Sequence, residues 1–331
     1  WRTYSAQRVE YDLTGLDLPL LPPSDSAFER AVFAGTLDGQ GGFIAALPDS
    51  VLVGASETLR LEAANASDFV SSGRVGLVWS VAPAVDARFA AFKSWRLPTL
   101  NEFYRPFRVR NDITEANADL DDETLLGIEV GLDYEPLNSV FASATVYWND
   151  LRGGVSNVTI AEGPGVFALA GFVPAGGVLR QRVNIDRQSI FGIELEARLR
   201  LSGGWQLGVQ YAYANSRVER AVSDPSLEGL RPPQVPRHSA RADLTYSRGP
   251  WQAGFDAQYQ SNRFEDDRES RPLGSAFVVS GHVSRALTHW LRASLSAENI
   301  FASRVLSAVT ADGFETLAQP RQLRAGLEAR F

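Results

Sequence analysis

The chain has 331 residues, a formal net charge of −7 and neither cysteine nor methionine. Without cysteine, disulfides, a thiol nucleophile and a cysteine metal site are all excluded. The acidic balance argues against nucleic acid as a partner. No run approaches about 18 consecutive apolar residues, so a transmembrane helix is not expected. The length allows one large β domain or two ordinary ones.

Apolar and polar residues alternate with a period of two in many segments, which is the spacing of a strand with two different faces. In 192–201, for example, Ile193, Leu195 and Leu199 share one face, and Glu194 and Arg198 share the other. A helical period fits none of these segments. The pattern predicts an all-β fold with about 13 or 14 strands. The clearest strands, in chain order, are 127–134, 192–201, 205–213, 239–246, 251–260, 291–299 and 322–331.

Short and long connections alternate from about Pro83 onward. The tight turns are 136–138, 202–204, 248–250 and 287–289, and the long connections are roughly 97–123, 153–179, 220–235, 264–272 and 305–318. Short turns at one end and long loops at the other are typical of an outer-membrane barrel, so a transmembrane antiparallel β-barrel is predicted. Water in a polar lumen would accept the charged face of each strand. Trp205, Trp251 and Trp290 each follow a tight turn and are expected to form an aromatic girdle at the membrane interface.

Several motifs occur in the order found in one known family. The stretch 95–132 resembles TonB-dependent outer-membrane receptors, and the later segments VYWNDLRGGVSN, RQRVNIDRQSIFGIELEA and ENIF resemble the strands that follow in that family. Ala302 and Val305 depart from its usual pattern after the last element. The resemblance is clearest over 74–331. Its motif residues are Arg96, Pro98, Thr99, Leu100, Glu102, Tyr104, Asn117, Leu120, Glu123, Gly127, Glu129 and Gly131.

The resemblance implies a plugged barrel of about 22 strands. Residues 1–331 would then form a portion of the barrel, with the plug domain absent from this chain. The plug and the remaining strands are expected on a separate polypeptide, or to have been cut off or left out. An open sheet has two unpaired edges, so a partner must complete it unless the chain closes as a smaller barrel.

The function implied by the resemblance is uptake of a scarce nutrient across the bacterial outer membrane, driven by the inner-membrane TonB complex. A ferric siderophore is the first expectation for the cargo, with cobalamin or a glycan next. The other implied partners are outer-membrane lipid, lipopolysaccharide and the barrel assembly machinery. Two alternatives remain open: a self-closed, porin-like passive channel, and a structural or adhesive barrel.

The loop that begins with the family motif is rich in arginine and aromatic residues. Guanidinium groups bind carboxylates in bidentate fashion and stack on aromatic rings, which suits an anionic metal chelate. The alternative is that these residues shape the barrel mouth or contact lipopolysaccharide phosphates. The candidate ligand-binding residues are Arg96, Asn101, Tyr104, Arg105, Arg108 and Arg110.

Other constellations carry weaker signals. Glu265, Asp266 and Asp267 could hold Ca²⁺, but the Gly-containing calcium-loop pattern is missing, and a solvated acidic loop tip is favoured. The histidines His238, His282 and His289 lack metal-ligand spacing, so neither a metal centre, a cofactor nor enzymatic activity is expected. The terminal Phe331 resembles the C-terminal signal that directs assembly of outer-membrane barrels.

Overall fold

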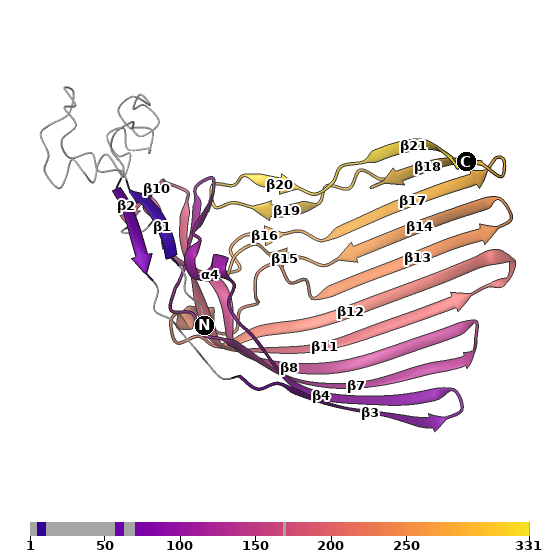
Figure 1. Ribbon diagram of the computed structural model, residues 1–331, viewed down its shortest axis with the longest axis horizontal. Coiled ribbons are helices and arrows are strands. Elements are labelled where there is room, and N and C mark those ends of the chain that lie inside the picture. Colours follow the sequence, from indigo (N-terminus) through magenta and orange to yellow (C-terminus); the bar gives the residue numbers. More distant parts are fainter. Residues whose placement is uncertain (1–4, 11–56, 63–69, 168–169, 331) are drawn as a thin grey trace, which may run out of the picture.

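A computed structural model describes residues 5–10, 57–62, 70–167 and 170–330. Its main feature is one antiparallel sheet in which consecutive long strands are neighbours (Figure 1). The long strands are β3 (Gly73–Ala82), β4 (Val85–Arg96), β7 (Glu123–Leu137), β8 (Val140–Glu162), β11 (Val178–Arg200), β12 (Trp205–Arg220), β13 (His238–Arg248), β14 (Trp251–Gln260), β17 (Ala276–Ala286), β18 (Leu291–Glu298) and β21 (Gln322–Ala329).

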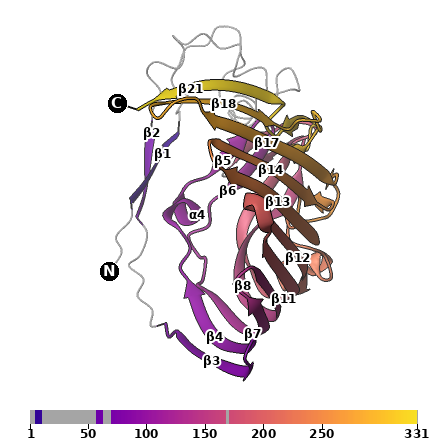
Figure 2. The same ribbon diagram turned by 90° about the vertical axis from the view of Figure 1, so that its right-hand side faces the viewer.

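The sheet bends into an open arc that runs from β3 at one edge to β21 at the other (Figure 2). It contains 13 strands when the loop strands β5 (Phe107–Val109) and β6 (Asp112–Glu115) are included. The predicted all-β class is confirmed. Among the described strands β3 and β21 are not paired with each other, so the self-closed barrel of the alternative hypothesis is not formed.

The predicted alternation of short and long connections is also confirmed. All tight turns lie at one end of the sheet and all long loops at the other, which is called the long-loop end below (Figure 1). The turns at Gly203 and Gly249 place these residues at φ of 78° and 58°, a region that glycine enters without steric cost. The tight turns therefore hold neighbouring strands in antiparallel register.

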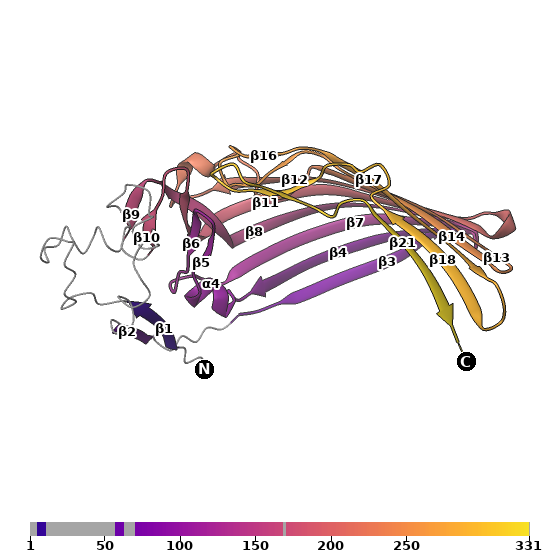
Figure 3. The ribbon, with the colours of Figure 1, turned by 90° about the horizontal axis from the view of Figure 1, so that it is seen from above.

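The connections between the long strands contain short helices and strands. They are α4 (Leu100–Tyr104), β9 (Gly165–Phe167), β10 (Gly171–Val173), η1 (Ser202–Gly204), η2 (Pro225–Leu227), β15 (Arg263–Phe264), β16 (Pro272–Leu273), β19 (Leu306–Val309) and β20 (Glu315–Leu317). Separately, β1 (Ser5–Glu10) pairs antiparallel with β2 (Glu57–Glu62). η1 is the tight turn between β11 and β12; the other loop elements, β5 and β6 included, gather at the long-loop end, and Figure 3 shows α4 and β5–β6 beside the ends of the long strands.

One predicted loop is shorter than expected. Residues 153–179 were expected to connect two strands, but β8 and β11 each have 23 residues, and only 163–177 connect them. A transmembrane strand needs only about 9–11 residues, so both strands continue well past the span that lipid requires. β6 adds to this extension in parallel, with Ile113 opposite Leu179. The extension forms a platform against which other loops pack.

The two faces of the sheet differ in chemistry. One face carries large exposed apolar side chains, such as Val130, Leu195, Phe255 and Leu327, which are 54%, 45%, 54% and 74% exposed. The concave face carries polar groups that pair with one another: Arg88 binds Asp133 at 2.7 Å, and Arg241 binds Asp256 at 2.6 Å. An apolar outer band and a polar interior are the pattern of a transmembrane barrel wall.

The buried apolar residues lie mainly at the long-loop end. One cluster joins Val158, Ile185, Val218, Ala221 and Leu227, which come from β8, β11, β12 and the loop that follows β12. A second cluster joins Ile113, Val173 and Leu179. The compact core of this chain is therefore built by the loops and strand extensions, where water surrounds it and the hydrophobic effect can act.

Trp205 and Trp251 are the first residues of β12 and β14, and Trp290 directly precedes β18. They are 38%, 42% and 40% exposed at the tight-turn end, and the girdle remains a prediction.

Arg330, next to the last strand, donates its backbone N–H to the backbone carbonyl of Trp290 at 2.9 Å. Phe331, the predicted assembly signal, lies outside the described residues. Within those residues no helix is long and apolar enough to cross a membrane.

The lipid-facing assignment makes a testable prediction at Phe255. Phe255→Arg places a guanidinium on the apolar face, and we expect it to destabilise the assembled protein by about 2–4 kcal/mol, the cost of a cation near the bilayer midplane. The matched control is Thr245→Arg, which lies at the same depth on the neighbouring strand but on the concave face, opposite Gly254. Denaturant unfolding in lipid vesicles measures both. Equal losses in the two variants would contradict the assignment.

Candidate ligand-binding site at the long-loop end

The loop between β4 and β7 begins with the helix α4, whose start is fixed by a capping box. Thr99 accepts the backbone N–H of Glu102, and the Glu102 carboxylate accepts the backbone N–H of Thr99 at 2.5 Å. Arg96 donates to Glu102 at 2.9 Å and to both oxygens of Glu123 at 2.6 Å. Although burial opposes ionisation, these hydrogen bonds lower the pKa of Glu102 to about 2.

The end of α4 is held by Arg182, which belongs to β11. Its guanidinium donates to the backbone carbonyls of Asn101 at 2.5 Å and Arg105 at 2.9 Å. The Asn101 carbonyl also accepts the backbone N–H of Arg105 at 3.1 Å, and a cation at a helix C-terminus interacts favourably with the last carbonyls. Arg182 also lies 5.3 Å from the ring centroid of Phe107. The helix is therefore fixed at both ends by arginines from long strands.

The predicted ligand-binding residues lie together in this loop, but several already bind other parts of the protein. Arg108 donates to the carbonyl of Phe172 at 2.7 Å, and Arg110 pairs with Asp312 at 3.1 Å. Desolvation lowers the pKa of Arg108. Arg105 is exposed and makes no side-chain ion pair with any described residue. A direct role in ligand binding remains a prediction, for which Arg105 and Tyr104 are the candidates best placed.

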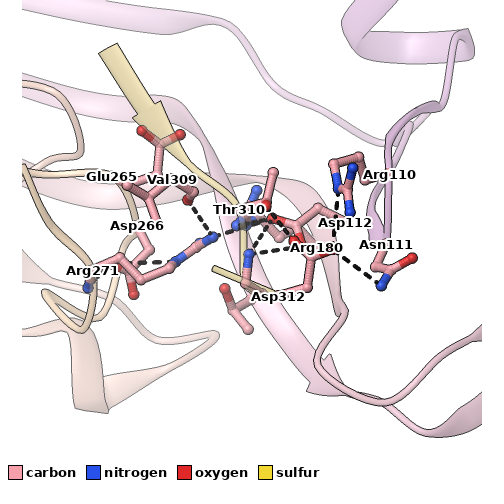
Figure 4. Close-up of polar contacts among 12 residues, drawn as sticks. Arg110, Asn111, Asp112, Arg180, Glu265, Asp266, Arg271, Val309, Thr310 and Asp312 are labelled. Carbon is pink, nitrogen blue, oxygen red and sulfur yellow. Dashed lines mark hydrogen bonds and ion pairs between the residues drawn. The ribbon is translucent and has the colours of Figure 1, made fainter. Parts of the chain in front are cut away.

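A buried carboxylate, Asp112, joins three loops at the first position of β6. It accepts Arg180 and Arg271, each at 3.1 Å, and the backbone N–H of Ala311 at 3.3 Å (Figure 4). Arg271 also donates to the carbonyl of Val309 at 3.0 Å. Asp112 is only 5% exposed, so water cannot replace these partners. We call Asp112, Arg180 and Arg271 the loop clasp.

A second contact lies beside the loop clasp, at the tip of the β19–β20 hairpin. Asp312 accepts Arg110 and, at 3.4 Å, the amide of Asn111. The guanidinium of Arg110 lies 4.4 Å from the ring centroid of Phe314. The hydrogen bond from Thr310 is the main cause of a lowered pKa at Asp312. The β4–β7 loop thus contacts a loop near the opposite edge of the sheet and crosses the open side of the arc.

The acidic residues proposed as calcium ligands instead accept hydrogen bonds that hold the loops of the long-loop end in place. Asp267 accepts the backbone N–H of Thr159 at 2.8 Å and its hydroxyl at 2.7 Å. Asp266 accepts the Ser270 hydroxyl at 2.6 Å and the backbone N–H of Arg271 at 2.8 Å. Both aspartates are buried, so the favoured alternative of a solvated loop tip is wrong for them. Across the described ranges no group of acidic or histidine side chains has metal-binding geometry.

Beneath the loop clasp the loops enclose a cavity of about 530 Å³. Its walls come from the extensions of β8 and β11, from β5 and β6, and from the loops that follow β12, β14 and β18. This volume is in the range of small-molecule sites. Side chains that line the cavity include Phe107, Asp112, Asn157, Arg180, Gln188 and Glu265.

Sequence reasoning located the motif loop but missed the residues that close the site. Asp112 and its partner Arg271 are separated by 159 residues, and Asp112 and Arg180 by 68. A single arginine near the start of a strand and another in a loop carry no local signal in one sequence. The alternation of charges within the strands could not show which loops meet above them.

Comparison with known proteins gives the family. The sequence model for the β-barrel of TonB dependent receptor-like proteins matches residues 48–300. The chain therefore belongs to the TonB-dependent receptor β-barrel family and is an integral β-barrel protein of the bacterial outer membrane.

Individual relatives agree with this assignment. The iron-regulated outer membrane virulence protein of Vibrio cholerae is 25% identical over 247 residues, which are 71% of this chain and 36% of that protein. The fold is similar to the siderophore receptor PiuA of Acinetobacter baumannii (TM-score 0.61, 16% identity, covering 83% of this chain and 37% of PiuA). It is also similar to the copper transporter OprC (TM-score 0.60, 19% identity, covering 83% and 39%). The chain thus spans about a third of the length of its curated relatives.

The loop clasp makes a prediction about loop mobility. Asp112→Asn leaves two buried guanidinium groups without their carboxylate, and we expect local opening of residues 306–317 to become easier by about 3 kcal/mol. Amide hydrogen exchange in this segment should then accelerate roughly a hundredfold. The control is Asp119→Asn, at an exposed carboxylate of the same loop. Unchanged exchange in the Asp112 variant would show that the loop clasp does not hold the hairpin.

Proposed function

We propose that this chain is part of a TonB-dependent transporter that takes up a metal chelate, a ferric siderophore in the first place. The observation that carries the proposal is the cavity enclosed by loops at the end of a polar barrel wall. A ligand bound there would lie between the external medium and the lumen. A scarce nutrient must be bound by the receptor before it crosses the outer membrane, because a simple open pore does not concentrate its solute.

The names of similar proteins support this choice of cargo. One is iron-regulated, one is called a siderophore receptor, and one a copper transporter. Each name describes only the protein that carries it, and all three names refer to iron, a siderophore or copper. Cobalamin and glycans remain alternative cargoes, and a structural or adhesive role remains an alternative function.

The unpaired edges of the sheet indicate what kind of partners this chain needs. Edge strands β3 and β21 expose backbone groups that lipid cannot satisfy. We propose that the remaining barrel strands and a plug complete the protein, on the same or a separate polypeptide, with the plug resting against the polar concave face. Energy would come from the TonB complex, assembly from the barrel assembly machinery, and the outer surface would meet lipid and lipopolysaccharide.

Uptake of radioactive iron by cells that carry the complete receptor tests the proposal. Ala308→Trp introduces a bulky ring at a residue that lines the cavity, and we expect at least a tenfold loss of ferric siderophore uptake. Ser307→Trp, next to it on β19 but outside the cavity lining, is the matched control. A protonophore should abolish wild-type uptake. Uptake that survives the protonophore would favour the passive channel and contradict the proposal.

A further inference from the structure

The cavity beneath the loop clasp differs from a site built for a polyanion. Two arginines line it, and both already have carboxylate partners: Arg180 binds Asp112, and Arg231 binds Glu269 at 3.1 Å. Arg231 is also stacked 4.5 Å from the ring centroid of Phe264. A bound anion would have to compete with Asp112 or Glu269 for one of these largely buried guanidinium groups, which weakens the existing ion pair.

Carboxylates outnumber the arginines on the same walls. Five line the cavity: Asp112, Glu123, Glu265, Asp266 and Asp267. Asp112 and Glu123 are paired with arginines, whereas Asp267 is satisfied by Thr159 alone among the described residues. Burial is the main cause of a raised pKa at Glu265, which favours its neutral form. A ligand with several negative charges would still meet the carboxylates of Asp266 and Asp267 at short range, where like charges are poorly screened.

Uncharged hydrogen-bonding groups are available instead. The amides of Asn157 on β8 and Gln188 on β11 both line the cavity, and neither side chain hydrogen-bonds to a residue of the described ranges. Each amide offers both a donor and an acceptor. Phe107 and Val109 of β5 add apolar surface, being 42% and 50% exposed. Such walls suit a ligand with amide and carbonyl groups and little net charge.

We propose that the cavity selects an uncharged ferric chelate of the hydroxamate class over an anionic catecholate chelate. Hydroxamate groups are monoanions that together balance the ferric charge, whereas catecholate dianions leave a strongly anionic complex. The inference rests on the proposed function, since it takes the cargo to be a ferric chelate. Asn157 and Gln188 are the residues that contact the chelate's amide and carbonyl groups.

Binding to the purified complete receptor tests the inference. The probes are the uncharged ferric complex of a cyclic trihydroxamate peptide and ferric enterobactin, an anionic catecholate complex. Titration calorimetry in detergent gives both dissociation constants. We expect the hydroxamate complex to bind at least tenfold more tightly, with an affinity that changes little with salt, because no net charge is neutralised.

A charge-altering variant identifies the cavity as the source of the selectivity. Asn157→Arg adds a guanidinium without a carboxylate partner and should improve catecholate binding about tenfold. It should weaken hydroxamate binding, since it removes an amide contact. Ser223→Arg adds the same charge at an exposed residue outside the cavity lining and should change neither.

Three results would overturn the inference: tighter catecholate binding by the wild-type receptor, no binding of either chelate, or equal effects of the two arginine variants. In the first and third cases the proposed uptake function stands, because a ferric chelate still binds. In the second case the cellular uptake experiment decides independently whether the receptor transports another cargo.

Discussion

The structure depends on one constraint: inside a membrane every backbone N–H and C=O must find a partner within the protein. The antiparallel ladder from β3 to β21 satisfies it for consecutive strands, and tight turns at one end keep the register. Once the ladder is set, side chains are distributed by alternation, with apolar groups outward and polar groups toward the lumen. Among the described strands of this sheet, β3 and β21 each have one edge without a neighbour, and these are the edges where the proposed further strands would join.

The same constraint explains why the compact core lies outside the lipid span. Within the sheet the apolar side chains face lipid and gain little from one another. At the long-loop end water, not lipid, surrounds the protein, and Val158, Ile185 and Leu227 bury one another between β8, β11 and η2. The extension of β8 and β11 gives the loops a rigid support. The loop clasp then ties the β4–β7 loop to the loops near the other edge, and a cavity is enclosed between them.

The sequence predicted what is local and repetitive. Strand positions follow from the period of two, as in Leu195 against Glu194, and the tight turns from glycine and proline. The extension of β8 and β11 was missed because residues 153–179 lose the regular alternation of a wall with lipid on one side and water on the other. The loop clasp was missed because its members are distant in the chain. Arg96 and Arg110 were expected to face a ligand, but they bind Glu123 and Asp312.

The central claim is that ligand binds in the cavity beneath the loop clasp, and anomalous scattering from iron tests it most directly. In crystals of the complete receptor soaked with a ferric chelate, we expect the iron peak inside the cavity, near Asn157 and Gln188 and below Asp112. An iron peak beside the exposed Arg105, or on the concave wall near Arg88 and Arg241 with the cavity empty, would contradict the claim.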